Sequence, residues 1–253
     1  MLAISLQSGS NGNCFYVETN GTKLLFDAGI CGSKAASRLS AHGRDIRDVD
    51  ALIISHDHTD HVSCAGVYQR KYGLPIFITP LTLQEAQRGG KLGKVHNVTC
   101  FQSGDQLQFG NVSVQTVPTP HDGVDGSAFV VSSGSKKLGI LTDLGHVFNE
   151  LSDIISSLDA VFIESNYDPA MLSSGPYPAF LKKRIQGPKG HLSNRESAEL
   201  LQAGSQLKWA CLAHLSECNN SPEVALRTHL NISGGRITFH TASRHMASEI
   251  FTL

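Results

Sequence analysis

The chain has 253 residues, enough to bury a hydrophobic core, and its 21 lysine and arginine residues nearly balance its 22 aspartate and glutamate residues. This near-neutral charge excludes a global field that attracts nucleic acid or an anionic membrane, so a polyanion would need a local basic patch. No apolar run approaches the ~20 residues of a membrane span, and the first residues lack the regions of a signal peptide.

The six cysteines form no CxxC pair, and their neighbours are mostly apolar or small. Such cysteines are typical of reduced thiols rather than of a disulfide framework. We therefore expect a cytoplasmic protein without membrane association, folded as a single domain over residues 1–253.

Strand-like runs alternate with helix candidates along the chain. A hairpin is expected first, with strands at 14–19 and 23–29, because the Asn-Gly turn between them favours tight hairpins. Further strands are expected at 51–55, 75–79, 111–119, 127–133, 137–143, 160–165, 210–216 and 235–241. Helices are expected at 33–41, 61–72, 80–88, 148–157, 194–204 and 221–229.

Capping residues mark two of the expected helices. We expect Asn194 to cap the helix at 194–204 and Gly204 to end it, while Ser221 and Pro222 begin the last helix. Strands come in blocks in both halves of the chain, with helices after each block. This order predicts an α/β fold with two sheets face to face and helices outside.

The stretch "LIISHDHTDHVS" at 52–63 carries four metal-ligand side chains within six positions. His56 and His58 point to the same side of an extended chain, and Asp60 and His61 fall in the first turn of the helix that follows. Imidazole and carboxylate together suit zinc, manganese or iron. The alternative is a polar turn without a metal.

Three further residues stand at strand ends, where they would complete two metal sites. His121 lies in the proline-framed "VPTPHDG", Asp143 follows "KLGILT", and His214 follows "ACLA". The two oxygens of Asp143 suit a bridge between two metals. Each residue taken alone is more often structural, but their occurrence in this order after the first cluster favours ligand roles.

The pattern His56-x-His58-x-Asp60-His61, followed by His121, Asp143 and His214, resembles the metallo-β-lactamase superfamily. The resemblance implies an αββα four-layer sandwich that holds two divalent ions per chain, zinc or manganese, with iron as a further option. It also implies how the ligands divide: His56, His58 and His121 on one ion, Asp60, His61 and His214 on the other, Asp143 between them, and Asp27 as a carboxylate that orders the histidine loop.

Other motifs separate the groups of this superfamily. Flavodiiron oxygen reductases carry Glu where this chain has His58, and true β-lactamases carry Cys or Ser where it has Asp143. The motifs "SGSNGNC", "FIESNYD", "GHLSN" and "AHLS" most resemble the YycJ/WalJ group, which is associated with 5′-to-3′ exonuclease activity on DNA. The arm that grips transfer RNA in related processing nucleases is not evident here.

The chemistry expected of two divalent ions is phosphodiester hydrolysis by a hydroxide that they hold, with Asp60 among the catalytic residues. His191 is the candidate acid for the leaving oxygen, or a donor to the phosphate, and Glu164 would tune it. The alternative for His191 is a loop imidazole that caps the next helix.

Substrate-binding candidates are side chains suited to a nucleic-acid backbone or base. They are Lys182, Lys183, Arg184 and Lys189 for phosphates, Tyr177 for stacking, and Ser10, Asn11 and Asn13 for a phosphate nest. Each has a structural alternative: a solvated helix face for the basic run, a packing residue for Tyr177, and a tight strand connection for the nest.

The leading interpretation is therefore a dinuclear metal-dependent exonuclease that acts on DNA. The runner-up is a hydrolase of a small ester, thioester or cyclic phosphodiester in the same site. Hydrolysis of β-lactams is a third interpretation, as a side activity. A non-catalytic binding protein is a fourth, and the complete ligand set disfavours it.

Overall fold

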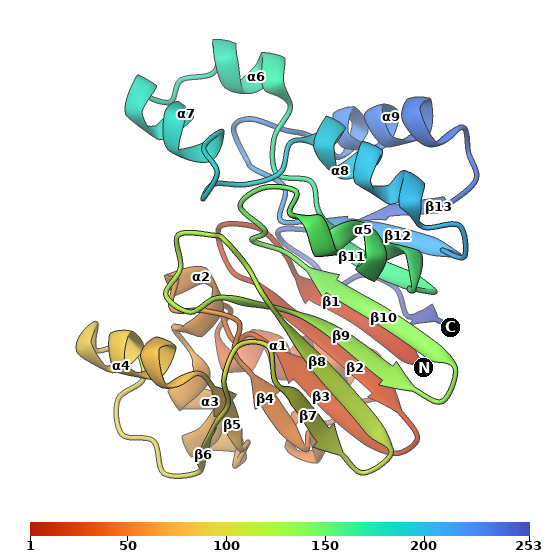
Figure 1. The fold of residues 1–253 in the computed structure, drawn as a ribbon. Coiled ribbons are helices and arrows are strands. Elements are labelled where there is room, and N and C mark those ends of the chain that lie inside the picture. Colours follow the sequence, from red (N-terminus) through yellow and green to blue (C-terminus); the bar gives the residue numbers. More distant parts are fainter. The chain divides into compact units, whose positions relative to one another are not determined.

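The computed structural model describes residues 1–253, and the chain divides into two compact units. Unit 1 contains Met1–Pro118, Gly123–Ser127 and Ser243–Leu253, and unit 2 contains Thr119–Asp122 and Ala128–Ala242. Both units combine β-strands with helices (Figure 1). None of the helices combines the length and apolar character needed to cross a membrane. The single domain expected over residues 1–253 stays a prediction.

Unit 1 contains a seven-stranded mixed sheet with the order β14-β1-β2-β3-β4-β5-β6. Its strands are β1 (Leu2–Gln7), β2 (Cys14–Thr19), β3 (Thr22–Phe26), β4 (Ala51–Ile53), β5 (Ile76–Ile78), β6 (Val98–Cys100) and β14 (Phe251–Thr252). Strands β1 to β3 pair antiparallel, whereas β3 to β6 pair parallel. Unit 1 also contains β7 (Gln106–Phe109) and β8 (Val112–Pro118), which pair antiparallel.

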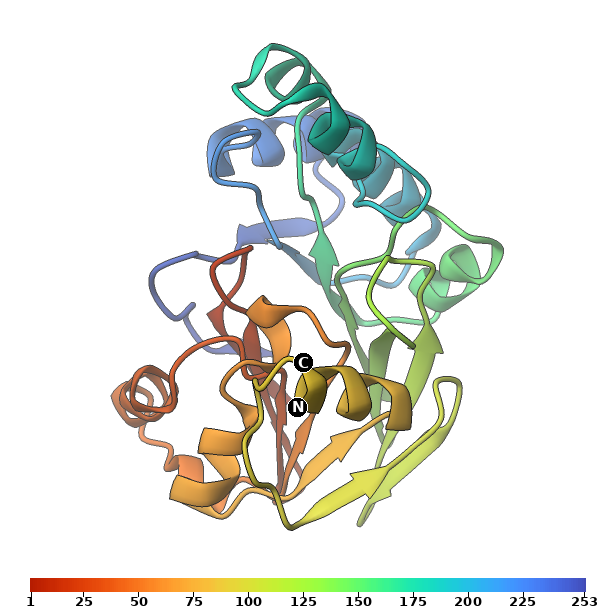
Figure 2. The ribbon, with the colours of Figure 1, turned by 90° about the vertical axis from the view of Figure 1, so that its left-hand side faces the viewer.

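The helices of unit 1 lie against one face of this sheet (Figure 2). They are α1 (Gly32–Ala41), the short η1 (Ile46–Asp48), α2 (Thr59–Val62), α3 (Ala65–Tyr72) and α4 (Pro80–Arg88). Leu39 of α1 and Tyr68 of α3 share one buried apolar cluster with Ile4 and Leu25 of the sheet. Because β3 and β4 are parallel, the segments that follow them, with Asp27 and His56, leave the same sheet edge.

Unit 2 contains the strand order β13-β12-β11-β10-β9. The strands are β9 (Ser127–Ser133), β10 (Lys136–Leu141), β11 (Ala160–Glu164), β12 (Trp209–Ala213) and β13 (Thr238–Thr241). Strands β10 to β13 are parallel, so Asp143, Glu164 and His214 all stand at the carboxyl ends of neighbouring strands. The helices are α5 (Asn149–Ser156), α6 (Pro169–Ser174), α7 (Ala179–Ile185), α8 (Asn194–Leu200) with η2 (Leu201–Ala203), and α9 (Pro222–Ser233).

Three expected helices differ from those observed. The last helix, expected at 221–229, extends from Pro222 to Ser233. The helix expected at 61–72 is two helices, α2 and α3, because the chain turns at Ser63 and Cys64. The cap of α8 is Ser193 rather than Asn194, since Ser193 and Glu196 form a reciprocal capping box. The caps at Ser221 and Gly204 are confirmed.

Candidate metal centre

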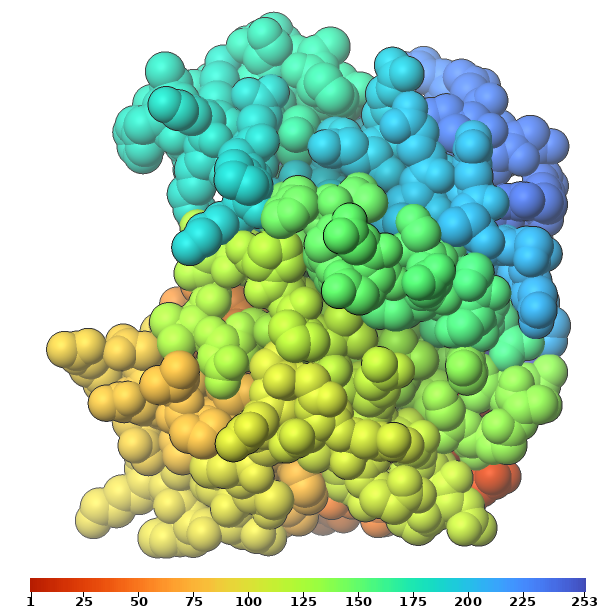
Figure 3. Space-filling view, in the orientation of Figure 1, coloured from red at the N-terminus to blue at the C-terminus, as the bar shows by residue number.

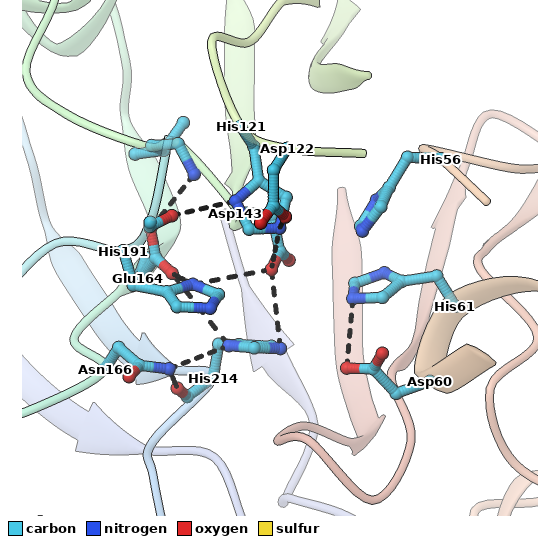
Figure 4. Close-up of polar contacts among 12 residues, drawn as sticks. His56, Asp60, His61, His121, Asp122, Asp143, Glu164, Asn166, His191 and His214 are labelled. Carbon is cyan, nitrogen blue, oxygen red and sulfur yellow. Dashed lines mark hydrogen bonds and ion pairs between the residues drawn. The ribbon is translucent and has the colours of Figure 1, made fainter. Parts of the chain in front are cut away.

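Four side chains gather after β4 and form the unit 1 cluster, which consists of His56, His58, Asp60 and His61. The His56 ring centroid lies 4.6 Å from that of His58 and 4.2 Å from that of His61. Asp60 Oδ2 lies 3.4 Å from Nε2 of His61 (Figure 4). Helix α2 begins at Thr59, so Asp60 and His61 occupy its first turn as expected.

Asp27 anchors this cluster from the end of β3. Its Oδ1 accepts a hydrogen bond from the Ser55 amide at 2.8 Å, and its Oδ2 accepts from Ser55 Oγ at 2.9 Å and from His61 Nδ1 at 2.7 Å. Because Ser55 Oγ gives its proton to Asp27, His56 Nδ1 donates to Ser55 Oγ at 2.9 Å. Both imidazoles therefore carry their lone pair on Nε2, the nitrogen left for a metal.

Asn13 is fully buried and contacts the same cluster. Its side-chain nitrogen donates to Asp60 Oδ2 at 3.2 Å and lies 3.0 Å from His61 Nε2, while its oxygen accepts from Ser8 and Gly9. Asn13 therefore positions Asp60 and His61. The sequence predicted only a phosphate-binding role for Asn13 and did not predict this contact. Ser10 and Asn11 of that stretch are exposed, and Asn11 Nδ2 donates to the Arg244 carbonyl at 3.0 Å.

Two glycines allow close approach to the unit 1 cluster. A Cβ on Gly123 would lie 2.4 Å from His56 Cδ2, and one on Gly29 would lie 1.7 Å from the Asp60 carbonyl oxygen. Neither glycine has a positive φ, so the need for glycine is steric. The backbone is thus packed directly against two candidate ligands.

In unit 2, the candidate ligand atoms of Asp143, Glu164, His191 and His214 all lie within 4.8 Å of one another. These four residues form the unit 2 cluster. Asp143 Oδ1 lies 3.5 Å from His214 Nε2, 3.7 Å from His191 Nδ1 and 3.6 Å from His121 Nε2. One carboxylate oxygen therefore faces three imidazoles (Figure 4).

Glu164 is fully buried and holds His191. Its Oε1 accepts from His191 Nδ1 at 2.6 Å, and its Oε2 accepts from the amides of Leu144 at 3.0 Å and Leu192 at 3.3 Å. The same carboxylate thus ties the loop after β10 to the loop that carries His191. The His191 side chain is 14% exposed, against 3% for that of His214, so a substrate reaches His191 more easily.

His121 and His214 are held by other groups of unit 2. His121 Nδ1 donates to the Gly190 carbonyl at 2.8 Å, which leaves the lone pair on Nε2. Asn166 Nδ2 donates to the His214 carbonyl at 2.9 Å and lies 3.1 Å from His214 Nδ1. The sequence did not single out Ser55 or Asn166, because neither stands in a recognisable ligand spacing.

The cluster donors are nitrogen and oxygen atoms rather than sulfur. Burial raises the pKa of the Cys14 and Cys211 thiols, which keeps both protonated and unsuited to a metal. Burial also raises the pKa of Tyr167 to about 12, so this phenol is neutral beside the unit 2 loops. Nitrogen and oxygen donors of this kind suit zinc, manganese or iron.

The basic substrate-binding candidates of unit 2 divide into two groups. Arg184 forms a bidentate ion pair with Asp122: Nε donates to Oδ2 at 2.6 Å and Nη2 donates to Oδ1 at 2.9 Å. Asp122 therefore compensates the charge of Arg184 within unit 2. Lys182 Nζ donates to the Ser173 carbonyl at 2.6 Å. Lys183 and Lys189 are exposed. Tyr177 is half-buried and packs against a small apolar cluster.

The order of the candidate ligands along the chain and the two clusters are typical of a metallohydrolase superfamily. The family model described as "Metallo-beta-lactamase superfamily" matches residues 8–189, and the chain belongs to this superfamily. It groups with the exodeoxyribonucleases called WalJ and YycJ. It is 38% identical to "Exodeoxyribonuclease WalJ" of Streptococcus pneumoniae over 89% of this chain and 86% of that protein. It is 34% identical to "Exodeoxyribonuclease YycJ" of Bacillus anthracis over 87% of this chain and 84% of that protein.

A solved structure shares the fold. The metallo-β-lactamase fold protein YhfI from Bacillus subtilis superimposes with a TM-score of 0.73, covers 98% of both chains and is 18% identical in sequence. The α/β, metallo-β-lactamase fold class expected from the sequence is thereby confirmed.

Proposed function

We propose that this chain is a metal-dependent exodeoxyribonuclease that removes nucleotides in the 5′-to-3′ direction. The observation that carries the proposal is the 38% identity over 89% of the chain to a relative named as an exodeoxyribonuclease. The two clusters support it, because imidazole and carboxylate donors are what a phosphodiesterase needs to hold divalent ions.

The donor set fits two divalent ions, zinc or manganese, with iron as a further option. In His56, His61 and His121, Nδ1 donates to a protein oxygen, so Nε2 is the nitrogen that carries the lone pair. Acceptors that fix the tautomer in this way are typical of metal-binding histidines. By the superfamily pattern, His56, His58 and His121 would serve one ion, Asp60, His61 and His214 the other, and Asp143 both.

Residues of the chain itself would transfer the proton, orient the candidate ligands and bind the phosphates. Bound divalent ions would activate water and neutralise charge on the phosphate. We assign His191 the proton transfer to the leaving oxygen, because it is the most exposed imidazole of the unit 2 cluster and Glu164 holds its Nδ1. Asp27 and Asn13 orient Asp60 and His61, and Lys183 and Lys189 contact backbone phosphates.

We also propose a cytoplasmic location for this activity. The six cysteines are all free thiols, and a cytoplasmic protein would keep them reduced.

A panel of substrates with protein loaded in turn with zinc and manganese tests the proposal. The panel contains linear single- and double-stranded DNA, circular single-stranded DNA, and bis(p-nitrophenyl) phosphate. An exonuclease degrades the linear DNAs and leaves the circle intact. Turnover of the small diester without loss of any DNA would contradict the proposal and favour the small-molecule hydrolase.

A further inference from the structure

The segment 169–190 forms an arm of unit 2, made of α6 and α7 and the connections after them, which we call the α6–α7 arm. Leu172 and Ile185 are buried in a small apolar cluster with Tyr167, against which Tyr177 and Leu181 pack. The arm stands out beside α8 and α9 in the ribbon and forms a distinct lobe in the space-filling view (Figures 1 and 3). Because these side chains pack against one another, the arm is a packed structural element rather than an unpacked loop.

The arm carries positive charge without compensating acids. Residues 169–195 contain no aspartate or glutamate, although the whole chain has a net charge of −1. Arg184 is paired with Asp122, but Lys183 and Lys189 are exposed to solvent. The arm is therefore the local basic patch that a near-neutral protein needs to hold a polyanion.

An aromatic ring lies exposed on the same helix. The Phe180 side chain is 76% exposed, the largest fraction among the exposed large hydrophobic residues, followed by Met246 at 68%. Phe180 and Lys183 are three residues apart in α7, so they share one helix face. An exposed ring beside a phosphate-binding charge is the combination that single-strand-binding proteins use to stack on bases.

The arm is fastened directly to the unit 2 cluster. The His191 amide donates to the Ile185 carbonyl at 3.0 Å, and the Asp122 amide donates to the Lys189 carbonyl at 3.1 Å. His121 Nδ1 bonds the Gly190 carbonyl at the end of the arm. A DNA strand bound to the arm would thus contact the same stretch of backbone that positions His121 and His191.

We propose that the α6–α7 arm binds the single-stranded end of a DNA substrate, with Phe180 stacked on an unpaired base and Lys183 on a phosphate. This inference rests on the proposed nuclease function and adds the form of its substrate. Duplex DNA buries both faces of its internal bases in stacking, so away from a duplex end Phe180 meets an open base face only where the strands are separated. A second copy of the arm fits less well, since it would bring lysine against lysine.

Equilibrium binding by the full-length protein in EDTA tests the inference without any cleavage. The probes are a fluorescein-labelled oligothymidine and an abasic oligonucleotide of equal length. Phe180→Ala is expected to weaken oligothymidine binding by ~5- to 100-fold. Phe180→Trp should retain it, and the wild type should bind the abasic strand about as weakly as Phe180→Ala binds oligothymidine. Met246→Ala, which removes another largely exposed apolar side chain, from unit 1, should leave oligothymidine binding unchanged.

The salt dependence of DNA affinity distinguishes the contribution of the Phe180 ring from that of the Lys183 charge. Lys183→Gln should reduce the slope of log affinity against log salt by about 0.7, as expected for one phosphate contact on a single strand. Phe180→Ala should leave that slope unchanged, and Lys34→Gln on α1 is the matched control. The inference would be overturned if Phe180→Ala bound oligothymidine as tightly as the wild type does, or if the wild type bound the abasic strand as tightly as oligothymidine. It would also be overturned if Phe180→Ala changed the oligomeric state of the protein while DNA binding stayed intact. If the binding pattern holds but no DNA is cleaved with metal, the nuclease proposal fails and the binding surface stands.

Discussion

Replacing Asp27 by asparagine isolates the electrostatic support of the histidine loop. Asp27 has a φ of 64°, a conformation that asparagine also tolerates, so the backbone need not move. The carboxylate accepts from Ser55 N at 2.8 Å and from His61 Nδ1 at 2.7 Å. An amide in either orientation points its NH₂ at one of these two donors. To avoid that contact at His61, the imidazole must move its proton to Nε2, the nitrogen assigned to the metal.

The loss of zinc affinity in Asp27→Asn can be estimated from the hydrogen bond between Asp27 and His61. A hydrogen bond to a charged group contributes about 1.5–3 kcal/mol, and a lost partner of a metal-binding histidine typically costs about 10- to 100-fold in metal affinity. The two magnitudes agree, because tenfold in affinity corresponds to about 1.4 kcal/mol. We therefore expect Asp27→Asn to bind zinc about 10- to 100-fold more weakly than the wild type.

Competition with a chromogenic chelator measures this affinity, well below the unfolding temperature of both proteins. Asp57→Asn is the matched control from the same loop. Asp57 Oδ1 accepts from the Val124 amide at 2.8 Å, a bond that an amide oxygen also makes. Zinc affinity unchanged in Asp27→Asn, or reduced equally in Asp57→Asn, would refute the assigned role of the Asp27 carboxylate.

Three further changes test other parts of the account. Glu164→Gln should keep bound metal but lower turnover about 10- to 100-fold, since one amide cannot keep all three contacts of the carboxylate; unchanged turnover would contradict the role of Glu164. Gly123→Ala should reduce the metal content measured by mass spectrometry, because its Cβ would displace the His56 ring. Burial lowers the pKa of His229 to about 4, so the folded protein keeps this imidazole neutral while the unfolded chain takes up a proton below about pH 6.5. The wild type should therefore lose roughly 2 kcal/mol of stability between pH 7.5 and 5, and His229→Gln should lose less, as measured by urea unfolding. An equal loss in both proteins would show that other groups cause it.

Local sequence signals predicted much of the fold. The Asn20-Gly21 turn has a positive φ at both residues and joins β2 to β3 as expected, and Ser221 with Pro222 begins α9. Strands β1, β6, β7 and β14 were not predicted. Strand β14 has only two residues and pairs with the opposite end of the chain. Helices α6 and α7 were missed because they have six and seven residues, too few for a helical period to stand out.

The candidate site was predictable where ligands are consecutive. The unit 1 cluster follows from six neighbouring positions. Asp143 and His214 could be proposed only as polar residues at strand ends, and the division of the candidate ligands between two ions required the superfamily pattern. Asp27, Asp143 and His214 all have a positive φ, and no sequence pattern announces such a backbone outside glycine. The contacts of Asn13 and Asn166 depend on packing between distant segments, which sequence spacing does not encode.

The proposed nuclease is tested most directly by a time course on single-stranded DNA that carries a 5′-phosphate and a label at one end or the other. The wild-type protein and Asp143→Ala are compared after loading with zinc or manganese, with metal per chain measured in the same samples. We expect two metals per wild-type chain, stepwise loss of nucleotides from the 5′ end, and neither result with Asp143→Ala. Intact DNA in wild-type samples that hold two metals per chain would contradict the account.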